Sequence, residues 1–395
     1  MLKKKIERIF VCLFGLLLSV SFVIAPAIGA EPVVKEWKVP SLIFLTGPYA
    51  GFGKQIKWGT DEAAAEINAA GGIAGRPLVI EWYDTGMDPA KAAAEMSKVV
   101  KSLTIFGPVG APNCKGALPL VVREKGFAMT VDSGAEVVSE FFPYTIHNSD
   151  MFERVTPPAT RGWAKRNPQM KTVIQFVFPF DPTFTDVANY QAKTLEAQGI
   201  KVLPNVEISE SVDLASAVIK AMGQKPDGFT IVTLPMDGAK IIKELDKRGV
   251  KDKSRVLTFP VVDDQSFFDL AKGYIDGLYI WHFQNVLSKS PRWQAFNAKW
   301  RKAFPDSQYA TFGTVCHYDM VYMFKAAVEK LGITGDPTKV VEERNKIREY
   351  CRNVKGFPGL QYNFDMVDGL GKTPTFLFRI ENGERKLVET YPPVK

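Results

Sequence analysis

The segment Ser41–Asp84 constrains the fold most, because it contains a strand, a loop, a helix and a second strand in that order. Ser41–Leu45 is short and apolar. Lys54–Ala70 carries apolar residues at helical spacing and ends at Gly71-Gly72, a strong helix stop. Leu78–Tyr83 is the next apolar run. Strand, helix and strand in succession build parallel sheets, so an α/β fold is predicted.

The same alternation continues in two successive runs along the chain. In the first run we expect a helix from Asp88 to about Lys101, a strand at 104–106, a helix at 115–124 and a strand at 127–131. In the second we expect strands at 172–178, 202–208, 228–233 and 255–259, with helices at 186–198, 214–222 and 239–248. Phe141–Pro158 separates the runs, which predicts two lobes, each a doubly wound parallel sheet.

The C-terminal part of the chain mixes strands and helices. We expect strands at 277–283, 359–364 and 374–380 and helices at 293–303, 314–331 and, as a charged solvent-facing helix, within 342–355.

The first thirty residues have the composition of an export signal. Met1–Arg8 is basic, Ile9–Ile24 is apolar, and small residues follow up to Ala30. The apolar run is shorter than the ~20 residues of a membrane-spanning helix. We therefore predict a signal peptide over 1–30, cleaved near Ala30, and a periplasmic mature protein.

Charge and cysteine content exclude several classes of function. The net charge is +7 and the charges are interspersed, with no basic stripe among aromatic residues, so no nucleic-acid partner is expected. Three cysteines follow the signal segment, Cys114, Cys316 and Cys351, and at least one must remain unpaired. No CxxC motif occurs, so no metal site and no cofactor are predicted.

Sequence motifs of enzymes are missing. The chain contains no GxGxxG, GxxxxGK[ST], HExxH or GxSxG, and its three histidines have no supporting motif. The carboxylate pair Asp263-Asp264 stands between a predicted strand and a helix. It fits a helix N-cap with Ser266 nearby, and alternatively a charge that faces a ligand.

Four loops follow the carboxyl ends of predicted strands, where open α/β sheets bind ligands. These loops are 46–53, 107–114, 132–136 and 180–185. Helix N-termini at such loops offer free N–H groups that suit a carboxylate. Aromatic side chains recur in them: Tyr49, Phe52, Phe180 and Phe184. We expect these rings to line a partly buried apolar pocket between the lobes.

The first segment resembles a known family. LTGPYAGFGKQ, followed by GTDEAAAEINAAGGIAGRPLVIEWYDTGMDPAKAA, is similar to the start of the leucine/isoleucine/valine-binding proteins of ABC importers. Weaker likenesses follow in the family's order: IFGPVGAPNCKGALPLVVREKGFAM, DGFTIVTLPMDGAKIIKELDKRGV, YIDGLYI and CHYDMVYMFKAAVEK. The resemblance implies a type I periplasmic binding fold, in which three crossover segments join the lobes. It implies an N-terminal lobe of 34–147 and 286–370 and a C-terminal lobe of 148–285 and 371–395.

The resemblance also implies ligand-binding positions in the first lobe. Phe52, with Tyr49 close by, takes the place of an aromatic that lines the side-chain pocket. The place of a serine that holds the ligand carboxylate reads Gly110-Ala111-Pro112, so Asn113 or Cys114 would have to substitute. The next loop offers Ser133 and the backbone of Gly134 and Ala135, with Glu136 where the family has threonine.

In the second lobe, the same comparison matches Phe184 to a tyrosine that meets the ligand ammonium. The acidic residue for that ammonium falls near Pro260, and Asp237, Asp263 or Asp264 could replace it only if the loops shift. Phe283 adds a further ring to the pocket, and its donors would be Asn113, Ser133 and Gln284. Because the partners for an amino acid's carboxylate and ammonium are both weakened, such a pocket suits an aromatic or other small organic acid, and an amino acid stays open as the alternative.

The leading hypothesis is therefore a monomeric, non-enzymatic solute receptor of an ABC importer. It would close by a hinge motion around a small carboxylate-bearing molecule and deliver it to membrane permease subunits. Two alternatives stay open: a ligand-sensing partner of a signalling receptor, and a secreted hydrolase with Asp263 or Asp264 as catalytic acid or base.

Overall fold

The computed structural model describes residues 34–47, 49–131, 134, 140–209 and 211–394. The predicted signal segment lies outside these residues. The chain from Val34 onward forms one compact unit, so the lobe limits given above stay a prediction. Among the described residues, no helix is long and apolar enough to cross a membrane.

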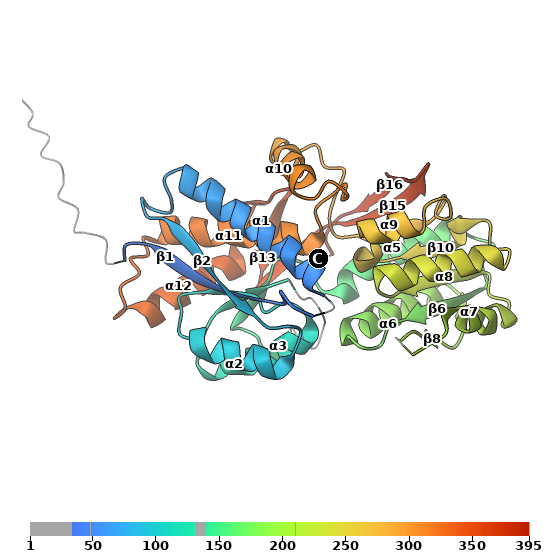
Figure 1. Ribbon diagram of the computed structural model, residues 1–395, viewed down its shortest axis with the longest axis horizontal. Coiled ribbons are helices and arrows are strands. Elements are labelled where there is room, and N and C mark those ends of the chain that lie inside the picture. The colour runs from blue at the N-terminus through green and yellow to red at the C-terminus, as the bar shows by residue number, and fades with distance from the viewer. Residues whose placement is uncertain (1–33, 48, 132–133, 135–139, 210, 395) are drawn as a thin grey trace, which may run out of the picture. The chain divides into compact units, whose positions relative to one another are not determined.

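Two mainly parallel sheets form the framework (Figure 1). The order of the first sheet is β12-β13-β14-β5-β4-β3-β1-β2. Its strands are β1 (Trp37–Ile43), β2 (Leu78–Asp84), β3 (Ile105–Phe106), β4 (Ala128–Thr130), β5 (Thr145–His147), β12 (Phe357–Pro358), β13 (Asn363–Val367) and β14 (Leu370–Lys372). The pairs from β2 through β5 to β14 are parallel, and β12, β13 and β14 pair antiparallel.

The order of the second sheet is β16-β15-β11-β10-β9-β6-β7, and β8 also pairs with β6. Its strands are β6 (Thr172–Val177), β7 (Lys201–Val202), β8 (Val206–Glu207), β9 (Gly228–Val232), β10 (Val256–Thr258), β11 (Tyr279–His282), β15 (Thr375–Glu381) and β16 (Glu384–Tyr391). Among the strands of this sheet that the structure describes, β15 and β16 run antiparallel to their neighbours and the others pair in parallel. The prediction of an α/β fold with two mainly parallel sheets is confirmed.

Helices cover the sheets. With the first sheet are α1 (Ala50–Ala69), α2 (Pro89–Val99), α3 (Ala111–Arg123), α10 (Pro291–Ala303), α11 (Phe312–Leu331) and α12 (Val340–Asn353). With the second are α5 (Phe152–Lys165), α6 (Pro182–Glu196), α7 (Leu214–Gly223), α8 (Pro235–Lys247) and α9 (Gln265–Leu270). Helix α1 packs on α11, and α2 packs on α3. A Cβ at Gly59 would lie 2.4 Å from Thr314 Cγ2, so only glycine allows this approach of α1 to α11.

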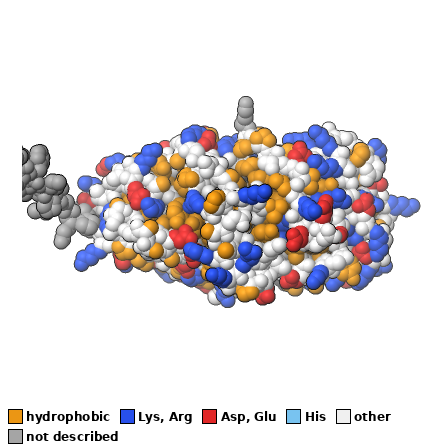
Figure 2. All heavy atoms as spheres, turned by 90° about the horizontal axis from the view of Figure 1, so that it is seen from above, with side chains coloured by type: hydrophobic (Ala, Val, Ile, Leu, Met, Phe, Trp, Pro, Cys, Tyr) orange, Lys and Arg blue, Asp and Glu red, His pale blue; other side chains and the backbone are white. Residues whose placement is uncertain are grey.

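The chain passes between the sheets three times: after β5, after β11 and after β14. Figure 2 shows acidic and basic side chains interspersed on the face that it draws, without a field of one sign.

Several local expectations need correction, and prolines explain most of them. The strand expected at 202–208 is two short strands on either side of Pro204, which has no N–H for the ladder. Helix α3 begins at Ala111, four residues before the expected start, because Pro112 fits a first helical turn. Helix α5 was not predicted, since Pro157 and Pro158 interrupt its pattern. The strand expected at 359–364 is β12 and β13, and β16 was also missed.

Candidate functional site

The loop after β1 is held in shape by the carboxylate of Asp84, the last residue of β2. Asp84 accepts hydrogen bonds from the Leu45 backbone at 2.7 Å, from Thr46 Oγ1 at 2.6 Å and from Lys91 Nζ at 2.7 Å. Burial works against the ionised form, but these bonds outweigh it and lower the pKa of Asp84 far below its ordinary value. The loop that carries Tyr49 is therefore anchored to the neighbouring strand.

Aromatic rings form a continuous run from this loop to the segment after β11. Phe44 contacts Tyr49 and Phe52, with ring centroids 6.1 and 6.2 Å apart. The ring centroid of Phe312 lies 5.4 Å from that of Phe52 and 5.4 Å from that of Phe283. Two predicted residues, Phe52 and Phe283, are thus joined through Phe312. Sequence reasoning missed Phe312, because nothing in the local pattern at the start of α11 distinguishes its ring.

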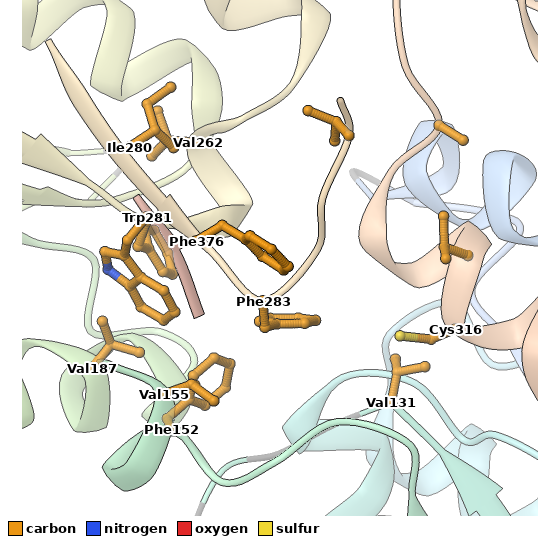
Figure 3. Close-up of a cluster of buried hydrophobic side chains, with 14 of the residues drawn as sticks. Val131, Phe152, Val155, Val187, Val262, Ile280, Trp281, Phe283, Cys316 and Phe376 are labelled. Atoms are coloured by element: carbon orange, nitrogen blue, oxygen red, sulfur yellow. The ribbon is translucent and has the colours of Figure 1, made fainter. Parts of the chain in front are cut away.

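Phe283 lies at the centre of a larger cluster (Figure 3). Phe152 and Trp281 lie on one side of its ring, and Cys316 and Val131 lie on the other. The centroid of Phe152 is 6.3 Å from that of Phe283. Phe283 is only 2% exposed, so it joins core residues of both sheets in this structure.

The loop after β3 brings the amino end of α3 to the carboxyl edge of the first sheet. Gly110 has a φ of 87°, and a Cβ there would lie 2.7 Å from Met87 Sδ, so this turn requires glycine. Asn113 Nδ2 donates to Thr85 Oγ1 at 2.8 Å and to the Val109 carbonyl at 2.9 Å. Cys114 Sγ donates to the Pro108 carbonyl at 3.4 Å. Both side chains are buried and bonded within the first sheet's own elements.

The loop after β6 meets this helix end from the second sheet. Asp181 caps α6, because its carboxylate accepts the Thr183 N–H at 2.9 Å. It also receives hydrogen bonding from the backbone N–H of Ala111. Burial raises the pKa of Asp181, although Thr183, Ala111 and the charge of Lys115 favour the ionised form. The carboxyl ends of β3 and β6, from different sheets, therefore face each other.

The second lobe presents apolar side chains at the same edge. Strands β6 and β9 are adjacent and parallel, so Phe180 after β6 and Met236 after β9 leave the sheet at one edge. Phe180 is 60% exposed and Met236 is 56% exposed. Phe184 is buried instead, 5.7 Å from Phe178 and 5.1 Å from Phe259 between ring centroids. Met236 was missed, because a single methionine in the first turn of a helix carries no signal.

The predicted acidic residues have protein partners. Asp263 pairs with Arg385 in the interior, with Arg385 Nε 2.7 Å from Oδ1. Asp264 caps α9 and accepts from the Ser266 backbone and hydroxyl at 2.9 and 2.6 Å, so the N-cap interpretation is confirmed for Asp264. Asp237 forms a surface ion pair on α8, with its Oδ1 3.7 Å from Lys240 Nζ.

The remaining predicted positions are Gln284, Ser133, Gly134 and Ala135. Gln284 is buried and donates to the Phe312 carbonyl at 3.0 Å. Gly134 is buried. Ser133 and Ala135 lie outside the described residues.

This arrangement, two mainly parallel sheets whose strand ends face each other across loops, defines a two-lobed α/β protein of the binding-protein class. Residues 36–385 match the family described as periplasmic binding protein. The chain belongs to that family. The Leu/Ile/Val-binding protein of Escherichia coli (strain K12) is 40% identical over 77 residues, which is 20% of this chain and 21% of that protein. The alignment thus spans about a fifth of such a relative.

Solved structures share the fold over most of the chain. One is a solute-binding protein of an ABC transporter from Rhodopseudomonas palustris BisB5, in complex with 3,4-dihydroxybenzoic acid. It has a TM-score of 0.77 and 19% identity, and the match covers 92% of this chain and 99% of that one. The branched-chain amino acid binding protein LivJ of Streptococcus pneumoniae, in complex with isoleucine, has a TM-score of 0.75 and 16% identity, covering 91% and 100%. The fold is the type I periplasmic binding fold.

Proposed function

We propose that this protein is the periplasmic solute-binding component of an ABC importer. It captures a small carboxylate-bearing solute, an amino acid or an aromatic acid, by hinge closure and passes it unchanged to membrane permease subunits. The family match and the fold support this proposal. The observation that carries it is the contact between Asp181 and Ala111. This contact brings together the carboxyl ends of β6 and β3, and such strand ends are where open α/β sheets bind ligands.

The proposed site has an apolar wall in each lobe. Tyr49 and Phe52 belong to the first lobe, and Phe180 and Met236 belong to the second. At the amino end of α3 a solute carboxylate would compete with Asp181 for the Ala111 N–H. We assign Phe184 a supporting role through Phe178, whose ring contacts both Phe180 and Phe184. Asn113, Cys114, Asp263 and Gln284 would shape the site through their own protein partners.

Thermal-shift screening tests the proposal, because a ligand that binds only the folded state raises Tm. The panel contains leucine, isoleucine, valine, benzoate, 4-hydroxybenzoate and 3,4-dihydroxybenzoate. For the compound that binds, Phe180→Ala should raise Kd about tenfold or more, since a lost phenyl contact is worth about 1.5–3 kcal/mol.

Val341→Ala is the matched control, because Val341 is 57% exposed on α12. Equal Kd values for Phe180→Ala, Val341→Ala and the unmodified protein would refute the assigned site. Mass spectrometry of the recovered solute should find it unchanged, whereas turnover would refute the receptor role.

A further inference from the structure

A small cavity lies beside the segments through which the chain leaves β5 and β11. Its volume is about 10 Å³, which is room for about one water molecule. Asn148 follows β5, Gln284 follows β11, and Gln361 lies between β12 and β13. All three side chains line the cavity and are at least nine-tenths buried.

Backbone partners determine which way each of these amides points. Asn148 Nδ2 donates to the Cys316 carbonyl at 2.8 Å, and Gln284 Nε2 donates to the Phe312 carbonyl at 3.0 Å. Gln361 Oε1 accepts the Asn285 N–H at 3.0 Å. Because a carbonyl accepts and an N–H donates, none of the three amides can be reversed without losing its bond.

Because one polar atom of each amide is bonded, the identity of its other polar atom, oxygen or nitrogen, is fixed. Asn148 Oδ1, Gln284 Oε1 and Gln361 Nε2 are buried and have no partner among the described residues. Leaving such an atom unpaired costs about 1–3 kcal/mol. The set consists of two acceptors and one donor. One water molecule can accept from Gln361 Nε2 and donate to Asn148 Oδ1 and Gln284 Oε1. The carboxyl of Asp319, which accepts the Leu360 N–H at 2.8 Å, also lines the cavity.

We propose that this cavity binds one structural water molecule, which accepts from Gln361 and donates to Asn148 and Gln284. The water would join the segments after β5 and β11 to each other and, through the carbonyls of Cys316 and Phe312, to α11. Because both segments pass between the sheets, the water stiffens the hinge. This effect on solute binding rests on the proposed function, whereas binding of the water does not.

Direct hydrogen bonds already join the segment after β11 to the loop before β13, so the water is not needed for that connection. Tyr362 donates from its hydroxyl to the Phe283 carbonyl at 2.7 Å, and Ser288 Oγ donates to the Gln361 carbonyl at 2.8 Å. These bonds fasten the segment after β11 to the loop before β13. The water is the element that also includes Asn148, from the segment after β5.

A crystal structure at atomic resolution is the first test. We expect one ordered water within about 2.7–3.2 Å of the three atoms. A dry cavity, or a bound ion with the shorter contacts of a metal at about 2.0–2.6 Å, would overturn the proposal.

A double-mutant cycle with Asn148→Ala and Gln361→Ala is the second test, read as the free energy of unfolding from urea titrations. If both residues hold the same water, the double variant loses less stability than the two single variants together. Additive losses would contradict the shared water.

The control cycle combines Asn148→Ala with Gln175→Ala. Gln175 is a buried amide on β6 and bonds the Ala188 carbonyl, so additive losses are expected. Neither test needs a solute. A change in solute Kd in Asn148→Ala then reports on the hinge, so failure of the proposed function and failure of the water site are told apart.

Discussion

Asp263 and Arg385 form a buried ion pair that joins the loop before α9 to β16. Their side chains are 2% and 5% exposed, and the guanidinium also lies over the ring of Phe268, 4.0 Å from its centroid. A carboxylate with this partner is neutralised within the protein. Its role is therefore to hold β16 against the second lobe, and a ligand ammonium would have to compete with Arg385.

Asp263→Asn should destabilise the protein by about 3–5 kcal/mol, because it leaves the Arg385 charge buried without its partner. Chemical denaturation measures the change. Asp237→Asn is the control, since Asp237 has only a surface pair with Lys240 and should change stability by less than about 1 kcal/mol. Similar small losses in both variants would contradict the structural role.

Asp181→Asn should redirect solute preference without unfolding the protein, because asparagine caps helices as well as aspartate. The substitution removes a carboxylate at the amino end of α3. We expect tighter binding of a solute that carries only a carboxylate, and at least about tenfold weaker binding of one whose ammonium pairs with Asp181. Calorimetric Kd values check this, and an unchanged Kd would remove Asp181 from the site.

Asp319 should make stability depend on pH. Burial raises the pKa of Asp319 from 3.8 to about 7, against the Leu360 N–H and the charge of Arg292. Between these values the folded state holds a proton that the unfolded state has released, so this stabilisation is lost as the pH rises through about 7. The difference in free energy of unfolding between Asp319→Asn and the unmodified protein should therefore shift by about 2–4 kcal/mol in favour of the variant when the pH is raised from about 4 to about 8.5.

Urea titrations of both proteins at the two pH values measure that difference. Burial lowers the pKa of His282 and of His317 to about 4, which weakens the fold as the pH falls from 6.5. Both histidines remain in the variant, so their effect cancels in the comparison. A pH-independent difference would show that Asp319 is ionised throughout.

The cysteines should be unreactive in the folded protein. Cys114, Cys316 and Cys351 are buried, and burial raises the pKa of the Cys316 and Cys351 thiols. A thiol reagent should label none of them in buffer and all three in denaturant. Labelling of fewer than three in denaturant would reveal a disulfide, and rapid labelling in buffer would contradict the burial.

Local pattern predicted the elements that depend on neighbours in sequence. The spacing in Lys54–Ala70 with Gly71-Gly72 anticipated α1, and Asp88-Pro89 anticipated the start of α2, where Asp88 accepts from the Ala90 and Lys91 N–H groups. The predicted strand ends also located the loops after β3 and β6, which approach each other at Ala111 and Asp181. These features follow from periodicity and turn chemistry, which act over a few residues.

Partners distant in sequence were decided only by the tertiary structure. Arg385 lies 122 residues from Asp263, and the ring that joins Phe52 to Phe283 comes from Phe312. A side chain's burial and partners depend on which distant segments the fold brings together. The sequence by itself therefore determined the two-sheet architecture and the loops of the proposed site, and the packing of the chain determined which of their side chains stay exposed.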